Sequence, residues 1–170
     1  MMPGTALPDA EQLLRALIDS MRAEVGPDTG LIGIHTGGVW LAERLHQALG
    51  IKAPLGTLDV SFYRDDFEKI GLHRDVKRSQ IPFEVDGRHL VVVDDVLYTG
   101  RTIRAAMNEL FDYGRPASIR LAALVDRGGR ELPIAAQYLG ATVVPPAGWS
   151  IELKRGTDDR LALAWHKDEG

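Results

Sequence analysis

Two patterns of apolar positions alternate along this chain. In the first pattern, apolar residues recur every three or four positions, which is the spacing of one buried helix face. In the second, they form short runs or strict alternations bounded by glycine, proline or polar residues, which is typical of strands. The first pattern predicts helices over 9–25, 39–49 and 101–113. The second predicts strands over 31–35, 57–63, 89–95, 118–126, 138–145, 149–155 and 160–166.

Local signals mark the ends of the predicted helices. Asp9 has the side chain of a helix N-cap, and Gln12 stands three residues later as its capping-box partner. Gly50 and Gly114 follow the second and third helices, as is common where a helix stops. These signals set the helix boundaries independently of the apolar pattern.

The order of elements predicts an α/β fold. Strands that alternate with helices form a mostly parallel sheet with helices on both faces. Ligands of such sheets bind beyond the carboxyl ends of the strands. Polar clusters follow three of the predicted strands, at 35–38, 94–102 and 126–131. We therefore expect these clusters to share one rim of the sheet.

Composition narrows the functional classes. The 170 residues fit a single domain over 1–170, and 45% apolar with 26% charged residues is typical of a soluble globular protein. The net charge of -4 gives no overall basic field for nucleic acid, although a local basic patch remains open. The chain has no cysteine, which excludes disulfides, thiolate nucleophiles and zinc–thiolate sites. It also shows no signal peptide and no apolar segment of membrane-spanning length, so we expect a cytoplasmic protein without a membrane partner.

The segment LVVVDDVLYTGRT, residues 90–102, carries the most specific chemistry. Its apolar run leads into Asp94 and Asp95, which we expect at the exit of a buried strand. Adjacent carboxylates repel each other, but they are suited to accept hydrogen bonds from neighbouring hydroxyls or to lie near hydrated Mg²⁺. The following 98–102 offers backbone N–H groups, threonine hydroxyls and a helix N-terminus, which together favour a phosphate. The pair of features predicts a ribose 5-phosphate site, and an ordinary capped strand–turn–helix is the structural alternative.

This block resembles the phosphoribosyl diphosphate (PRPP) signature of type I phosphoribosyltransferases. More closely, the chain resembles the PyrR family of pyrimidine operon attenuation proteins, which are uracil phosphoribosyltransferases that in some bacteria also bind mRNA. The resemblance implies the type I phosphoribosyltransferase fold: a twisted, mostly parallel sheet flanked by helices, a flexible lid over 64–80, and a small hood. The hood would come from 126–133 and the C-terminal strands. The segments that carry the likeness are 31–45, 59–67, 91–107, 112–134 and 138–140.

The resemblance also implies a role for each motif. Asp94 and Asp95, together with Arg64 of the lid, would be the catalytic residues, and Mg²⁺ would act through PRPP near the two aspartates without a direct protein site. The ribose phosphate of PRPP would contact Asp94, Asp95, Tyr98, Thr99, Gly100, Arg101 and Thr102. Its pyrophosphate would lie on the loop Thr36, Gly37 and Gly38. Further lid cations are Arg74, Lys77 and Arg78.

Two positions depart from relatives in an informative way. Better-known members carry Arg where Gly37 stands, so a plain glycine turn is the alternative for that loop. Purine transferases carry Asp where Tyr98 stands, next to the base N7, and its absence favours a pyrimidine. The base would then be recognised by Val125, Asp126 and Arg127, for which a salt bridge within the loop is the structural alternative.

The expected function is transfer of ribose 5-phosphate from PRPP to uracil, giving UMP and pyrophosphate, coupled to regulation of pyrimidine biosynthesis genes. The first alternative is an mRNA-binding attenuator that senses UMP or UTP with weak or no catalysis, and the second is a purine or orotate transferase. RNA-binding members carry Thr-Arg and a nearby His in the first helix, whereas the corresponding stretch here, LIDSMRAEVG, has the acidic Asp19 and lacks that pattern. Expected partners are PRPP, uracil, UMP or UTP, and further copies of the chain in a homodimer or homotetramer. For an mRNA leader, the candidate contacts are Arg22, Arg127, Arg130, Lys154 and Arg155.

Overall fold

The computed structural model describes residues 2–60 and 79–169. Its centre is a five-stranded sheet in the order β2-β1-β3-β4-β5, in which every neighbouring pair is parallel. Three helices, α1, α2 and α4, accompany the sheet in the described part of the chain. The strands of this sheet are β1 (Gly30–Ile34), β2 (Gly56–Leu58), β3 (His89–Leu97), β4 (Ser118–Asp126) and β5 (Tyr138–Thr142).

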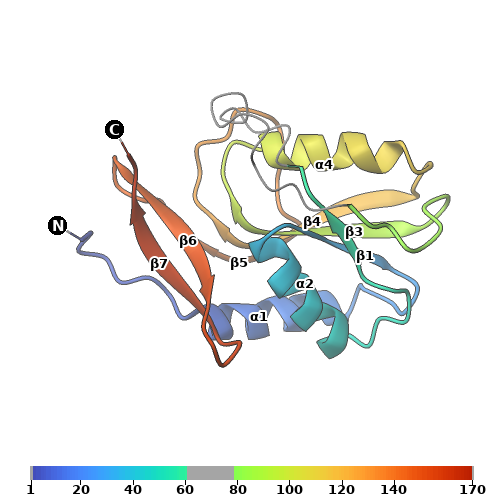
Figure 1. The fold of residues 1–170 in the computed structure, drawn as a ribbon, viewed down its shortest axis with the longest axis horizontal. Helices are drawn as coiled ribbons and strands as arrows, with labels where there is room; N and C mark the ends of the chain where they lie inside the picture. Colours follow the sequence, from blue (N-terminus) through green and yellow to red (C-terminus); the bar gives the residue numbers. More distant parts are fainter. Residues whose placement is uncertain (1, 61–78, 170) are drawn as a thin grey trace.

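The helices cover both faces of the sheet, as the element order predicts. Figure 1 shows α1 (Ala10–Arg22) and α2 (Gly37–Ala48) on one face and α4 (Arg101–Phe111) on the other. Two buried clusters match these faces: Val91 and Val93 belong to the cluster with α1 and α2, and Leu90 and Val92 to the cluster with α4. Successive strand residues point to opposite faces of the sheet, so β3 needs apolar residues at consecutive positions to contribute to the buried clusters on both faces.

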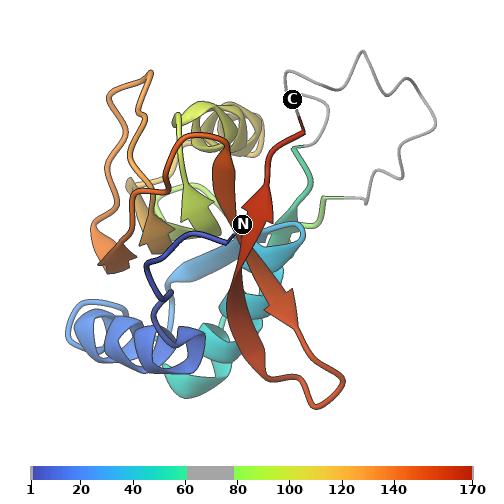
Figure 2. The ribbon, with the colours of Figure 1, turned by 90° about the vertical axis from the view of Figure 1, so that its left-hand side faces the viewer.

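The two C-terminal segments form a separate antiparallel hairpin, β6 (Trp149–Arg155) and β7 (Leu161–Lys167). Glu11 of α1, only 7% exposed, anchors the hairpin by accepting a hydrogen bond from the backbone N–H of Leu161, and it accepts two more from Arg44 of α2. These donors, Arg44 first, lower the pKa of Glu11 although burial opposes them. Trp165 Nε1 also donates to the Thr5 carbonyl at 3.1 Å, and Figure 2 shows the N-terminal segment running alongside the hairpin.

Most predicted boundaries agree with the structure within a few residues. Asp9 caps α1 by accepting from the N–H groups of Glu11 and Gln12. The strand expected over 57–63 is shorter, since β2 is Gly56–Leu58 and the part beyond residue 60 lies outside the described residues. No helix in the described part of the chain is long and apolar enough to cross a membrane.

Candidate active site

The aspartate pair lies within β3 rather than at its exit, which corrects the expectation from the sequence. The strand continues to Leu97 because β4 is long enough to pair with it there, Leu97 opposite Asp126. Asp94 is 8% exposed and Asp95 is half-buried. Each carboxylate accepts a hydrogen bond from the next backbone N–H, from Asp95 N at 2.9 Å and from Val96 N at 2.8 Å. These bonds orient both side chains at the carboxyl end of the sheet.

The expected pyrophosphate loop packs directly on this pair. Gly37 and Gly38 are buried in the first turn of α2, and Thr36, its N-cap, is exposed. An alanine Cβ would lie 2.4 Å from Asp95 Oδ2 at position 37 and 2.4 Å from the Val93 carbonyl oxygen at position 38. Both distances are shorter than real contacts of a Cβ, so only glycine lets α2 approach β3 this closely. The space that an arginine at position 37 would need is occupied by Asp95.

The expected phosphate-binding segment connects β3 to α4. Gly100 is the N-cap of α4 with φ 95°, a left-handed conformation that favours glycine. Thr99 accepts a hydrogen bond from Arg101 N at its Oγ1, 3.1 Å away, and Thr102 is half-buried in the first turn of α4. The Arg101 guanidinium pairs with Glu131 on the surface, at 2.7 Å. The N-terminal turn of α4, with its positive dipole end, therefore follows directly on the strand that carries the aspartates.

The segment at the end of β4, residues 126–134, folds over this turn; it is called the base loop below, after the role that the sequence predicts for it. Backbone N–H groups of Glu131 and Leu132 donate to the Thr99 carbonyl at 2.9 and 3.1 Å. Ile134 lies against Gly100, since an alanine Cβ there would be 3.0 Å from Ile134 Cγ1. Gly128 and Gly129 have φ of 75° and 82°, and Gly129 packs against the Tyr98 ring. The base loop and the phosphate-binding segment thus form one rim, as predicted.

Inside the base loop, Asp126 is occupied by the loop itself. Its Oδ1 accepts from Gly128 N at 2.9 Å, and its Oδ2 accepts from Arg130 Nη2 at 2.5 Å. The hydrogen bond from Arg130, followed by that from Gly128, holds the pKa of Asp126 below its ordinary value although burial opposes this. The salt bridge that the sequence left open as an alternative is therefore present, and it involves Arg130 instead of Arg127.

Arg127 makes a different set of contacts. Its guanidinium stacks on the exposed Tyr98 ring, 3.8 Å from the ring centre, while its backbone N–H donates to the Leu97 carbonyl. Its Nε is buried and has no hydrogen-bond partner among the residues that the structure describes. A buried donor of this kind is costly unless a ligand or water satisfies it. Val125, the third expected base contact, has a fully buried side chain, so only its backbone can face a ligand.

Two expectations lie wholly or mainly outside the described residues. Arg64, Arg74, Lys77 and Arg78 fall within 61–78, as does the expected lid except for Ser79 and Gln80. Gln80 pairs with Thr57 of β2 through two backbone hydrogen bonds of 2.8 Å. The sequence named Arg130 only as a candidate mRNA contact and gave it no role beside the expected base contacts. Asp126, its salt-bridge partner, is four positions away, but its contact with the Tyr98 carbonyl spans 32 positions and has no local signal.

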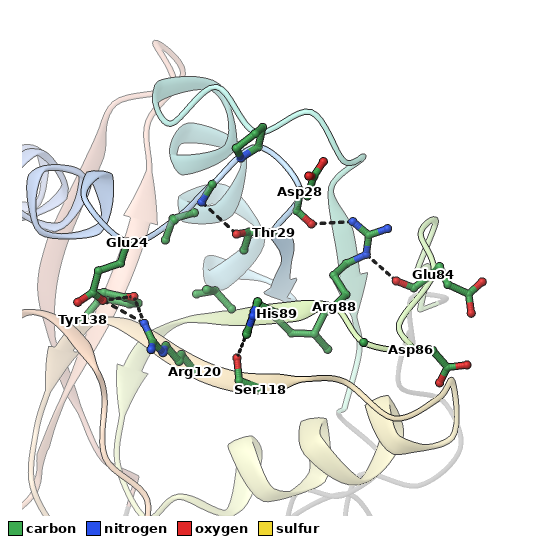
Figure 3. Close-up of a pocket in the computed structure, with 16 residues that line it drawn as sticks. Glu24, Asp28, Thr29, Glu84, Asp86, Arg88, His89, Ser118, Arg120 and Tyr138 are labelled. Atoms are coloured by element: carbon green, nitrogen blue, oxygen red, sulfur yellow. Dashed lines mark hydrogen bonds and ion pairs between the residues drawn. The ribbon is translucent and has the colours of Figure 1, made fainter.

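A pocket of about 580 Å³ lies at the opposite edge of the sheet, where β3, β4 and β5 begin (Figure 3). Its polar groups largely satisfy one another. Tyr138 donates to Glu24 at 2.5 Å, and Arg120 donates to both Glu24 and Tyr138, at 3.1 and 3.0 Å. None of the site residues predicted from the sequence lines it. The chemistry of the aspartate pair therefore belongs to the other edge.

Comparison with known proteins agrees with this geometry. The family model described as the phosphoribosyl transferase domain matches residues 5–152. A protein named "Bifunctional protein PyrR" from Pseudomonas paraeruginosa (strain DSM 24068 / PA7) is 52% identical over 163 residues, which cover 93% of this chain and 89% of that protein. The protein of the same name from Pseudomonas entomophila (strain L48) is 56% identical over 142 residues, 81% of this chain and 83% of that one.

Solved structures support the fold. A Trypanosoma cruzi hypoxanthine phosphoribosyl transferase has a TM-score of 0.62 at 22% identity and covers 84% of this chain and 79% of its own. A hypoxanthine-guanine phosphoribosyltransferase from Bacillus anthracis has a TM-score of 0.63 at 19% identity, and the match covers 84% of this chain and 86% of that one. At these identities the likeness concerns the arrangement of strands and helices alone.

Proposed function

The chain belongs to the phosphoribosyl transferase family and, within it, to the PyrR proteins, and on this premise we propose that it transfers ribose 5-phosphate from PRPP to uracil. The products would be UMP and pyrophosphate. The observation that carries the proposal is the meeting of three parts on one rim. These parts are the carboxylates of β3, the N-terminal turn of α4 and the base loop that packs on it.

The proposed reaction assigns a role to each part. The N1 atom of uracil bonds to C1 of the ribose while the C1–oxygen bond breaks, and its electron pair leaves with pyrophosphate. The N1 proton is released to solvent. Positive charge that develops on the ribose ring is stabilised by the neighbouring carboxylates of Asp94 and Asp95, which also accept hydrogen bonds from the ribose hydroxyls. The N–H groups at the start of α4, with Thr99 and Thr102, hold the 5-phosphate.

Arg127 is the proposed selector of the base. Its buried Nε needs an acceptor, and uracil presents two carbonyl oxygens on either side of an N3–H. The Tyr98 ring, on which the guanidinium stacks, fixes the direction of this donor. Asp126 contributes by shaping the base loop, since its two oxygens accept hydrogen bonds from Gly128 N and from Arg130.

Mg²⁺ is the expected companion of PRPP. Within residues 2–60 and 79–169, no group of three or more His, Asp or Glu side chains could hold a metal ion by itself. Two adjacent carboxylates instead suit an ion that keeps several waters and takes its other ligands from a phosphorylated substrate. Asp94 and Asp95 would lie near the ion of Mg²⁺–PRPP, which PRPP itself would hold, and the ion would neutralise charge on the leaving pyrophosphate.

The direct test is uracil-dependent release of pyrophosphate from PRPP in the presence of Mg²⁺. The proposal requires release that depends on all three components and yields UMP in equal amount. If pyrophosphate appears at the same rate without uracil, or if no UMP forms, the proposed reaction is wrong.

We propose a second function, binding of an mRNA leader, because the chain resembles attenuation proteins of the PyrR family; the name "Bifunctional protein PyrR" of its relatives is consistent with two activities. Exposed cations on the hairpin, Lys154 and Arg155, and Arg22 of α1 are the candidate phosphate contacts. Arg155 stacks on Trp40 and lies 3.9 Å from Glu43, but 40% of its side chain is exposed and can meet a phosphate. RNA affinity that falls with rising salt, and falls further when Lys154 and Arg155 are both replaced by Gln, is the expected result. RNA affinity that changes neither with salt nor with replacement of Lys154 and Arg155 would contradict this second function.

A further inference from the structure

The guanidinium of Arg130 donates hydrogen bonds to three separate parts of the rim. Its Nη1 donates to the Tyr98 carbonyl at 2.7 Å, in the phosphate-binding segment. Its Nη2 donates to Asp126 Oδ2 at 2.5 Å, where β4 ends, and its Nε donates to the Ile134 carbonyl at 2.8 Å, at the far end of the base loop. The side chain is 25% exposed, so most of it lies within the protein.

These three contacts close the base loop onto the phosphate-binding segment. Asp126 and Ile134 are the two ends of the base loop, and Arg130 draws both of them to Tyr98. The backbone bonds from the base loop to the Thr99 carbonyl run alongside this connection. The position of Arg127, which lies between the two ends, therefore depends on Arg130, whose guanidinium donates to the base loop and to Tyr98.

We propose that Arg130 is a positioning residue that sets the base site at a fixed distance from the ribose phosphate site. The inference rests on the proposed function, since it assumes that one ligand spans both sites. Arg130 acts through Tyr98, Asp126 and Ile134, and it contacts no substrate atom itself. The planar fork of arginine suits this task, because a lysine ammonium in its place has one nitrogen and cannot reach three acceptors in the same directions.

The experiment compares two ligands that differ by the base. UMP spans the base loop and the phosphate-binding segment, whereas ribose 5-phosphate needs only the latter. Calorimetric dissociation constants for both are measured on the full chain for the wild type, Arg130→Gln, Arg130→Lys and Arg120→Gln. Arg120 is the matched control, because it also bonds a carboxylate and a tyrosine, at the opposite edge of the sheet. Thermal unfolding of every variant confirms that each is folded at the temperature of the titration.

Arg130→Gln should weaken UMP about tenfold and ribose 5-phosphate less than about twofold, because only the relation between the two sites is lost. The dissociation constant of UMP for Arg130→Lys should lie between those of Arg130→Gln and the wild type. Arg120→Gln should leave the dissociation constants of both ligands unchanged. Asp126→Asn, which weakens one arm of the network, should act in the same direction, and adding it to Arg130→Gln should cause little further loss. Equal losses for the two ligands, or an unchanged affinity for UMP, would overturn the inference.

The outcome separates this inference from the proposed reaction. A wild-type chain that binds UMP but makes none from uracil and PRPP disproves the reaction and leaves the test of Arg130 intact. A wild-type chain with full turnover, in which Arg130→Gln keeps the affinity for UMP, disproves only the positioning role.

Discussion

Replacing Gly37 with alanine should damage PRPP turnover much more than folding. The added Cβ would lie 2.4 Å from Asp95 Oδ2 and 2.9 Å from its Cγ, so one of the two side chains has to move. Asp95 moves more readily, because its carboxylate is the end of a half-buried side chain and accepts a hydrogen bond from Val96 N that can be exchanged for water. The expected effect is a carboxylate displaced from the position in which it would accept ribose hydroxyls.

The two energies can be compared. Breaking the hydrogen bond from Val96 N to this carboxylate costs up to about 1.5–3 kcal/mol, while alanine in place of glycine in the first turn of α2 returns up to about 1 kcal/mol. The free energy of unfolding should therefore fall by about 2 kcal/mol or less, which leaves the protein folded. A charge-assisted bond from a ribose hydroxyl is worth about 1.5–3 kcal/mol, which corresponds to a loss of about 10- to 100-fold in kcat/KM for PRPP.

The assay measures kcat/KM for PRPP at saturating uracil, together with the midpoint of thermal unfolding. Gly26→Ala is the matched control, because a Cβ at position 26 meets nothing within 4 Å. It should leave turnover unchanged. Wild-type kcat/KM in folded Gly37→Ala would refute the role given to Asp95, and loss of activity that only tracks loss of the folded state would refute the reasoning from geometry.

Three further predictions follow from the same rim. Asp94→Asn combined with Asp95→Asn should lower kcat/KM for PRPP by at least about 100-fold while circular dichroism stays that of the wild type; wild-type kinetics would show that the ribose lies elsewhere. Arg127→Met should raise KM for uracil about tenfold and leave the affinity for Mg²⁺–PRPP unchanged, and a change confined to PRPP would contradict its role in base selection. Asp126→Asn should lower the free energy of unfolding at pH 7 by about 1 kcal/mol. Because the pKa of Asp126 is depressed in the folded state, its ionised form stabilises the protein above the ordinary carboxyl pKa of 3.8, and this stabilisation is lost as the pH falls through the folded value. The difference between wild type and Asp126→Asn in urea unfolding should therefore shrink from pH 5 to pH 3, and a difference that grows instead would mean the opposite sign of the shift.

The elements and the rim could be predicted from the sequence because their signals are local. The apolar run of β3, the capping of α1 by Asp9 and the glycine at the start of α4 each depend on neighbours within a few positions. Parallel order then brings strand ends together without further information. The place of the aspartates inside β3 was not predictable in this way, since it depends on how far β4 extends beside them.

The contacts that each charged residue of the base loop makes could be seen only in the three-dimensional structure. In the sequence, Asp126 and Arg127 stand side by side as an acceptor and a donor. In the structure, Asp126 pairs with Arg130 while Arg127 stacks on Tyr98. Gly128 and Gly129, which lie between Arg127 and Arg130 and have positive φ, make the turn that brings Arg130 back to Asp126. Gly37 is a similar case. Glycine is needed at this position because of its contact with Asp95, 58 positions away, and no local sequence pattern predicts that contact.

The central claim, a PRPP site joined to a pyrimidine site, is tested most directly by initial rates with several bases. Uracil, cytosine, orotate, hypoxanthine and guanine are supplied at equal concentrations with saturating Mg²⁺–PRPP, and nucleotide formation is measured for each. Uracil should be the fastest by far, because cytosine reverses part of its donor and acceptor pattern and leaves buried groups unpaired at about 1–3 kcal/mol each. A purine turned over faster than uracil would contradict the account of the base loop.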